Sequence, residues 1–431
     1  MTKRKRFRVT CVAAMAMLAV SAALQATTYR IEIDYMVGGS PNHSHVPSAA
    51  VINAVVQMFA CQGHTLIVDV DDALTHYNIL RRDPDGCDDC DAAFFSYDGE
   101  PASFGLLKSG NFDHAGDDPA WHYCIFAHQY EDSCCDTTTS SGLAEGSSDD
   151  FIVSLGAFSN DTGTLFDQAA TLAHEFGHNI GLGHCGTMYC GSDEDDPDYV
   201  GPYVPNMPSV MSYRYQLTGV RTNMLANGLT FDLALFKDID YSHGRMCGLN
   251  ENSLNEVLGT LMVSTDFDCD GSLEVGPVVK DLNGGNSGWC SAVGNRTSIF
   301  DYNEWANIED PLNGGGGGGG GIIEEAPIVY SCITAEEVAE VQEEIAPRGT
   351  GTQPPLSTES CISGQNMYIG PLFFVEAGTC TLPYDHVQQA HDVAPNNSRF
   401  YIRPGTYNQA PTITLDKPGY YFCNTGTAVI E

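Results

Sequence analysis

One continuous string of residues constrains this chain more than any other feature. Residues 174–184 read His-Glu-Phe-Gly-His-Asn-Ile-Gly-Leu-Gly-His without a gap. If residues 165–179 form a helix, His174 and His178 lie one turn apart on the same face, so both imidazoles can bind one cation. Glu175 then projects beside them, toward the open coordination position of the metal. The spacing therefore predicts a zinc site with a carboxylate next to it.

The third histidine of the string requires the chain to leave the helix. A continued helix would carry His184 away from the metal, so we expect a sharp turn after Asn179. Gly181 tolerates the positive φ that such a turn needs. His184 then completes a set of three histidine ligands, and Glu175 is placed to take a proton from a water that zinc acidifies. The expected chemistry is hydrolysis.

A second motif lies downstream at residues 209–213, which read Ser-Val-Met-Ser-Tyr. Together the two motifs resemble the metzincin zinc metallopeptidases, whose signature is the longer zinc motif followed by a methionine in a turn. The resemblance implies that Met211 forms a hydrophobic floor under the three histidines. It also implies that Tyr213 approaches the zinc and stabilises an oxyanion, as in astacin-like and serralysin-like members. The alternative for Tyr213 is a packed aromatic ring under the site.

The resemblance covers roughly residues 29–308 and implies an α+β fold. A metzincin-like catalytic domain has a twisted mixed sheet with two main helices, followed by an irregular lower subdomain, which here begins after Gly181. The residue patterns agree with this order. Strands are expected at 29–36, 64–70, 121–128 and 150–155, and helices at 47–60 and 165–179.

The beginning of the chain predicts export. A basic start is followed by an apolar run at 9–24 that is rich in small residues and too short for a confident membrane span. We therefore expect a signal peptide at 1–26 and a secreted, extracellular protein. No later run approaches the length of a transmembrane segment.

The remaining sequence predicts a catalytic domain, a linker and a C-terminal segment. The zinc protease domain is expected at 27–313. Eight consecutive glycines at 314–321 offer no side chains for packing, which predicts a flexible linker. Residues 322–431 are expected to form a small β-rich segment. Parts of it, at 385–397, 400–407 and 412–418, resemble the first coil of a pectin-lyase-like parallel β-helix, which implies no catalytic residue here.

Charge excludes some partners. The chain has 56 acidic and 19 basic residues, for a net charge of −37. Such a surface argues against nucleic acid and anionic membranes as partners. The expected partners are protein or peptide substrates, and the sequence does not predict an oligomeric state.

The large number of cysteines is consistent with an exported protein. The chain has 16, of which Cys11 lies in the predicted signal peptide, so the number left is odd. Most are expected to form disulfides, with one thiol unpaired or bonded to another chain. Cys185 directly follows His184. A disulfide with Cys190 is favoured there over a free thiolate that binds the zinc and keeps the enzyme latent.

An acidic loop predicts a calcium site. Oxygen-bearing side chains alternate at Asp266, Asp268, Asp270 and Ser272, with a glycine at the sixth position of the loop, and Ca²⁺ prefers such oxygen ligands around a tight bend. The twelfth position is a proline where an EF-hand has glutamate, so Asp281 is the candidate that completes the shell, within a calcium-loop-like segment at 266–285. An acidic turn without an ion is the alternative. For His43 and His45, we expect solvated side chains in a polar loop rather than another metal site.

These observations predict a secreted zinc-dependent endopeptidase of the metzincin type. Its cofactors would be Zn²⁺ and, through the acidic loop, Ca²⁺. The alternative is a non-catalytic extracellular binding or adhesion protein built on a degenerate protease scaffold, which the β-helix-like C-terminal segment favours. The intact Glu175 argues against that alternative, because a pseudoenzyme commonly loses the base or a ligand.

Overall fold

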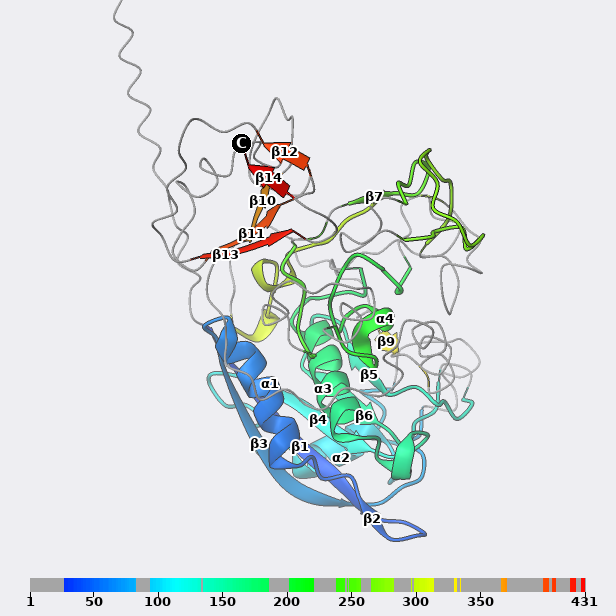
Figure 1. Cartoon of the computed structure of the whole chain (residues 1–431). Coiled ribbons are helices and arrows are strands. Elements are labelled where there is room, and N and C mark those ends of the chain that lie inside the picture. The colour runs from blue at the N-terminus through cyan, green and yellow to red at the C-terminus, as the bar shows by residue number, and fades with distance from the viewer. Residues whose placement is uncertain are drawn as a thin grey trace, which may run out of the picture.

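A computed structural model of the chain shows an α+β fold built on one large mixed sheet (Figure 1). It describes residues 27–82, 94–132, 135–185, 201–220, 238–244, 246, 248–256, 265–282, 296, 298–313, 329–331, 334, 366–369, 398–402, 405–407, 419–423 and 428–430. The predicted signal peptide and the predicted glycine linker lie outside these residues. The helices are α1 (Ala49–Cys61), α2 (Phe104–Asn111), α3 (Leu165–Asn179) and α4 (Tyr213–Gln216), with short 3-10 turns at η1 (Ser159–Asp161), η3 (Glu304–Ala306) and η4 (Pro311–Asn313).

The central sheet combines parallel and antiparallel pairs. Its strands are β1 (Thr28–Gly38), β2 (His43–Ser44), β3 (Thr65–Thr75), β4 (His122–Ala127), β5 (Gly142–Glu145), β6 (Asp150–Ser154) and β9 (Val329–Ser331). β1 pairs in parallel with β3 on one side and with β4 on the other, and β4 pairs in parallel with β6. β5 then runs antiparallel to both β6 and β9, and β2 folds back against the end of β1.

Both faces of this sheet are covered, because side chains alternate along each strand. In β4, Cys124 and Phe126 face a core shared with α1 and α3, whereas Tyr123 and Ile125 face a second core that includes Phe104 of α2. The residue patterns correctly predict β1, β4, β6, α1 and α3 within a few residues. They also predict β3, but with its end at 70, whereas the strand continues to Thr75. They miss α2, β2 and β5, which are too short to show a clear period.

Helix α3, which carries the first motif, starts at a defined cap. The Thr164 hydroxyl accepts from the Asp167 N–H at 3.2 Å, and the Asp167 carboxylate accepts from the Thr164 N–H at 2.8 Å. This reciprocal pair satisfies two N–H groups that the helix start would otherwise leave without partners. α3 packs against α1 and against β5 and β6, so the sheet and both helices fix its position.

A late segment returns to cover the helices. Residues 298–313 begin with β8 (Ser298–Ile299), which pairs antiparallel with β7 (Leu249–Asn250). The Trp305 ring packs against Phe59 of α1, with ring centroids 5.2 Å apart, and against Tyr241 at 4.9 Å. The Glu309 N–H donates to the Ile180 carbonyl at 2.9 Å, just beyond the end of α3. The core around α1 and α3 therefore includes residues far beyond the two sequence motifs.

Glu304 in this returning segment gives a pH-dependent prediction. Its carboxylate is fully buried and accepts from the Ser242 N–H at 2.5 Å. Burial raises the pKa of Glu304 to about 8. Because the folded chain then holds a proton that the unfolded chain releases from about pH 4.5, this group loses its stabilising contribution as pH rises from about 4.5 to 8. We expect Glu304→Gln to unfold at a higher denaturant concentration than the wild type at pH 8, with the difference shrinking toward pH 5.

Denaturant titrations of both proteins across that pH range provide the measurement. The exposed Glu309 on the same segment offers a control through Glu309→Gln. A stability difference that stays constant from pH 5 to pH 8 would contradict the assignment of the proton to Glu304.

The C-terminal strands form separate parallel pairings. β11 (Ser398–Ile402) lies between β10 (Asn366–Ile369) and β13 (Gly419–Cys423), and β12 (Gly405–Tyr407) pairs with β14 (Ala428–Ile430). Parallel pairing of successive segments is what stacked solenoid coils require. The assignment to a pectin-lyase-like β-helix stays a prediction.

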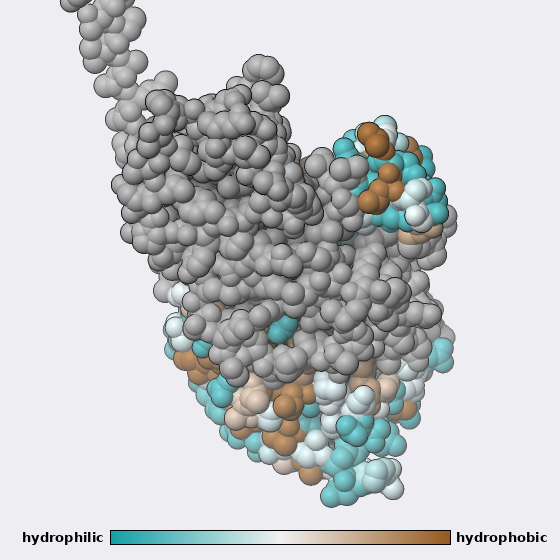
Figure 2. Space-filling view, in the orientation of Figure 1, coloured by the Kyte–Doolittle hydropathy of each residue, from teal (hydrophilic) through white to brown (hydrophobic). Residues whose placement is uncertain are grey.

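The described surface is mixed in character on the face that Figure 2 shows. Hydrophobic residues are visible on the described segment that projects beside β7, and Leu273, Val275 and Val279 of the 265–282 region are exposed. Among the described helices, none has the length and apolar content to cross a membrane.

Candidate metal centre

The three motif histidines come from α3 and from the turn that ends it. His174 and His178 lie one turn apart on α3. The chain then leaves the helix at Ile180, and Gly181 has the left-handed φ of +91° that the sequence predicts. The Leu182 N–H donates back to the Gly177 carbonyl at 2.9 Å, which closes the turn. This geometry returns His184 to the face of α3 that carries the other two histidines.

The three imidazoles converge through their Nε2 atoms. His178 Nε2 lies 3.0 Å from His174 Nε2 and 3.1 Å from His184 Nε2. The side chains of His174 and His178 are fully buried. Ligands of a tetrahedral zinc at 2.0 to 2.1 Å are about 3.3 Å apart, so this spacing fits a single metal ion.

The Nδ1 atoms of His174 and His178 form hydrogen bonds that fix the orientation of these two rings. His174 Nδ1 lies 2.7 Å from the Val210 carbonyl, and His178 Nδ1 lies 2.7 Å from the Leu182 carbonyl. A carbonyl only accepts, so each Nδ1 carries the proton and each Nε2 presents a lone pair. Two lone pairs 3.0 Å apart repel each other in a buried site unless a cation lies between them. The residues present therefore fit a metal that binds imidazole nitrogen, and Val210 and Leu182 are partners that the sequence analysis does not identify.

Burial keeps these histidines neutral, which is the form that binds metals. Burial lowers the pKa of His174 to about 4, although its hydrogen bond to Val210 acts in the opposite direction. Burial, followed by the neighbouring imidazoles, also lowers the pKa values of His178 and His184 well below the ordinary histidine range.

Glu175 follows His174 on α3, and its buried carboxylate lies against β5. A Cβ atom on Gly142 of β5 would overlap the Glu175 carboxylate and lie 2.7 Å from the Ile152 carbonyl. Only glycine therefore allows the strand to approach the carboxylate so closely. The sequence does not mark Gly142 as part of the site, because a single glycine in a short strand carries no recognisable signal.

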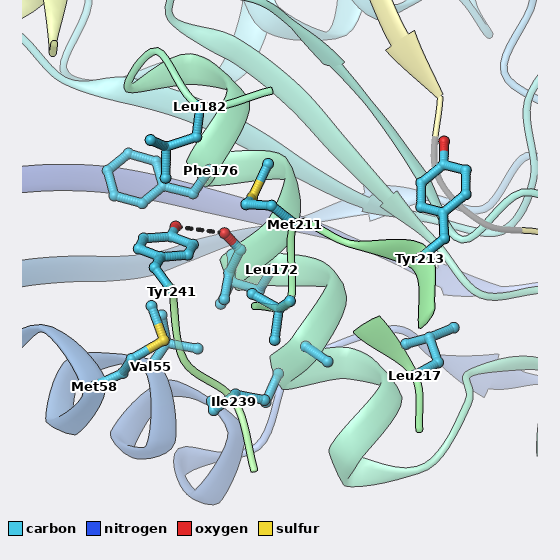
Figure 3. Packing of buried hydrophobic residues seen from close by; sticks show 14 of the residues in the cluster. Val55, Met58, Leu172, Phe176, Leu182, Met211, Tyr213, Leu217, Ile239 and Tyr241 are labelled. Atoms are coloured by element: carbon cyan, nitrogen blue, oxygen red, sulfur yellow. Dashed lines mark hydrogen bonds between the residues drawn. The ribbon is translucent and has the colours of Figure 1, made fainter. Parts of the chain in front are cut away.

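Met211 lies under the helix that carries two of the histidines. It is fully buried, and a Cβ on Gly177 of α3 would overlap its sulfur. Figure 3 shows Met211 packed near Phe176, with Tyr241 donating a hydrogen bond to the Ala173 carbonyl of α3 at 2.6 Å. Gly177 in the motif thus permits the close packing of this methionine against the helix.

Tyr213 lies on the opposite side of Met211 from Phe176 and Tyr241 (Figure 3). Its ring centroid is 4.5 Å from that of His184 and 5.9 Å from that of His174. The ring therefore packs directly on the histidine cluster. This position is compatible with both predicted roles, packing and stabilisation of an oxyanion, so the catalytic role stays a prediction.

Asn179 anchors the end of α3 to the sheet. Its Nδ2 donates to the Glu145 carbonyl of β5 at 2.7 Å and to the Asp150 carbonyl of β6 at 3.0 Å. Its Oδ1 lies 3.2 Å from Nδ1 of the buried His122. The sequence analysis treats this position only as the point where the helix ends. The structure shows that its amide holds α3 against two strands.

We expect Asn179→Ala to destabilise the fold by about 1–3 kcal/mol, because it leaves buried carbonyl groups without donors. Chemical denaturation of the two proteins measures this difference. Asn307→Ala is a matched control, since that exposed amide donates to the Asn303 carbonyl at 2.7 Å. Equal, small effects of both substitutions would contradict the anchoring role.

The cysteine near the site is not a free thiolate. Cys185 takes part in a disulfide bond, as do Cys61, Cys135 and Cys269. Cys190, the predicted partner of Cys185, lies outside the described residues, so the pairing of these two cysteines stays a prediction. Among the described residues, Cys124 is a free buried cysteine. Burial, followed by the charge of Glu175, raises the pKa of the Cys124 thiol well above its usual value.

The acidic loop brings together only part of its predicted calcium ligands. Asp266, Asp268 and Asp270 carboxylates lie within 4.8 Å of one another. The Ser272 hydroxyl instead donates to Asp270 at 2.6 Å, and Asp281 belongs to neither carboxylate group of this region. Backbone N–H groups already occupy Asp266, including that of Gly271 at 2.8 Å. Calcium binding stays a prediction from the sequence.

The expectation of a solvated side chain is wrong for His45, whereas His43 is half-buried. His45 is 5% exposed rather than solvated, and both residues join His76 and His128 in a second histidine cluster. Burial, followed by the neighbouring imidazoles, lowers the pKa of His45 to about 3. No local sequence pattern predicts this cluster, because its members are up to 85 residues apart in the chain.

The fold and the site together define an α+β protein with a buried three-histidine centre that is compatible with zinc. No protein-family model matches the chain, and no curated protein matches it. Among solved structures, the chain is similar to a zinc-dependent peptidase from Methanocorpusculum labreanum, with 18% identity and a TM-score of 0.21. The match covers 42% of this chain and 86% of that one.

Proposed function

We propose that the protein is a zinc-dependent endopeptidase of the metzincin type. The observation that carries this proposal is the convergence of three Nε2 atoms at the helix that also carries the buried Glu175. His174, His178 and His184 would hold the zinc. A bound zinc ion lowers the pKa of water toward neutrality and stabilises negative charge on a carbonyl oxygen. The Met211 packing and the Gly181 turn support the metzincin assignment, because both motifs of that resemblance meet at one place.

Glu175 would carry the protons in this reaction. As a carboxylate it takes a proton from the attacking water, and as an acid it delivers that proton to the amine that leaves the cleaved peptide bond. Gly142 lets β5 pack directly against this carboxylate, which restricts its position. Exclusion of water from the buried side chain strengthens its electrostatic effect on the reacting groups. Tyr213, adjacent to His184, is proposed as the donor that stabilises the oxyanion.

The test is digestion of an unfolded protein by the purified chain. We expect cleavage that a zinc chelator abolishes and that added zinc restores. Peptide fragments identified by mass spectrometry would show internal cleavage and so distinguish an endopeptidase from an exopeptidase. A folded, zinc-loaded chain that leaves the substrate intact would contradict the proposal and favour the extracellular binding protein.

We also propose that the protein is secreted. The basic and apolar start of the sequence supports this, and so does the participation of Cys185 and three other cysteines in disulfides. Protein or peptide substrates in an oxidising, extracellular setting follow from this proposal. Immunodetection in the culture medium of a chain expressed with its first 26 residues provides the test.

A further inference from the structure

A second set of histidines meets at one end of the central sheet. His43 belongs to β2, His45 follows it, His76 comes directly after β3, and His128 comes directly after β4. The pairing register explains their meeting. Gly38 of β1 pairs with His43, Val37 pairs with Thr75 of β3, and Tyr35 pairs with Phe126 of β4. Three strands thus deliver their terminal histidines to the same end of β1.

The four rings approach as ligands of one ion do. His43 Nε2 lies 3.0 Å from His45 Nε2, 3.2 Å from His76 Nε2 and 3.4 Å from His128 Nδ1. His45 Nε2 and His76 Nε2 are 3.4 Å apart. All four candidate ligand atoms lie within 4.8 Å of one another. Tetrahedral zinc ligands at 2.0 to 2.1 Å are about 3.3 Å apart, so most of these separations match that geometry.

Hydrogen bonds among the rings do not account for this arrangement. His43 Nδ1 lies 2.8 Å from the Pro41 carbonyl, so it carries the proton and His43 Nε2 presents one lone pair. Three other imidazole nitrogens lie within 3.4 Å of that single lone pair. One lone pair cannot accept well from three donors, whereas a cation at the centre would take one lone pair from each ring.

The surroundings keep the rings in place. A Cβ on Gly39, where φ is +80°, would lie 3.0 Å from the His76 ring and 3.1 Å from the His43 ring. A Cβ on Gly156 would lie 2.8 Å from the His128 ring. Glycines therefore stand where the backbone passes close to three of the four imidazoles. Such close packing fixes the rings and limits how far they can separate without an ion.

We propose that His43, His45, His76 and His128 form a second metal site that binds one zinc ion. Imidazole nitrogens suit zinc, and four protein ligands fill a tetrahedral shell and leave no position for a water. The site is therefore structural and differs in kind from the three-histidine centre. Its role is to join β2, which has only two residues, to the ends of β3 and β4. The proposal does not depend on the proposed peptidase activity.

Zinc stoichiometry tests the proposal. Elemental analysis of the full chain purified with zinc should give two equivalents for the wild type and one for His76→Gln. A second variant, His43→Gln, should also bind one equivalent of zinc. It replaces His76→Gln in the test if circular dichroism shows that His76→Gln does not fold. His114→Gln is the matched control, because His114 belongs to neither histidine cluster, and it should keep two. Equal zinc in the wild type and in the folded cluster variants would overturn the proposal.

Two further experiments distinguish zinc binding at this site from zinc binding at the three-histidine centre. His178→Ala should retain one zinc, and X-ray absorption of that variant should show four nitrogen ligands at about 2.0 Å. His76→Gln should keep its chelator-sensitive cleavage activity if the proposed function holds. If cleavage is absent from every variant but the zinc counts differ as stated, the proposed function fails and the structural site stands. Fewer than four nitrogen ligands around the zinc in His178→Ala would contradict the proposal that four histidines fill the coordination shell.

Discussion

Replacing Glu175 by glutamine is expected to lower the turnover of peptide cleavage by about 10²–10⁴-fold, the usual contribution of a general base. Glutamine keeps the size of the side chain but cannot take a proton from water. The zinc content should stay at the wild-type value, because the three converging Nε2 atoms are untouched. Turnover and zinc content measured on the same preparation therefore separate loss of the base from loss of the metal.

The exposed Glu100 supplies the control for this experiment. Glu100→Gln removes one negative charge from the surface and should leave turnover unchanged. Denaturation curves for Glu175→Gln show whether the buried substitution has also changed stability. Full activity of a folded Glu175→Gln protein would eliminate the proposed mechanism.

The second large effect is expected from His178, whose Nε2 lies within 3.1 Å of the Nε2 atoms of both other histidines of the proposed zinc centre. Its Nε2 makes both of the close contacts, and its Nδ1 donates to the Leu182 carbonyl in the turn that returns His184. Loss of a hydrogen-bond partner of a ligand typically costs about 10–100-fold in metal affinity or activity. Loss of the ligand itself should exceed that, so we expect His178→Ala to lose measurable zinc at this centre and all detectable cleavage.

Competition with a fluorescent zinc chelator measures the affinity of each variant. His64→Ala provides a control, because His64 is a buried histidine that stacks on Trp305 and belongs to neither histidine cluster. Unchanged zinc affinity after His178→Ala would show that the imidazole is not a ligand.

Local sequence patterns predicted the residues of the three-histidine site, but they did not predict the residues that hold this site in position. His174, Glu175 and His178 share one helix, so spacing alone places them, and Gly181 has the backbone conformation that its position in the string requires. Gly142 and Asn179 act through contacts with strands or with α3, and no local pattern marks such contacts. Their roles follow only from the way β5 and β6 pack against the helix.

The second histidine cluster shows more clearly that local patterns do not predict contacts between distant parts of the chain. His43 and His45 stand in a polar stretch, and read alone they indicate a solvated loop. Their neighbours His76 and His128 come from other strands, and only the pairing register of the sheet brings the four together. A sequence read along one segment cannot show a site assembled from three strand ends.

The contact between the Glu309 N–H and the Ile180 carbonyl determines where a working fragment of this protein can end. A chain cut soon after residue 213 would contain every motif that resembles a peptidase. It would nevertheless lack Trp305 over Phe59 and Tyr241, and the carbonyl at the end of α3 would lose its donor. A shortened gene for biochemical work should therefore extend through residue 334, which keeps β9 paired with β5 and the bridge between Ser140 and Thr334, because the minimal folding unit is longer than the minimal recognisable sequence.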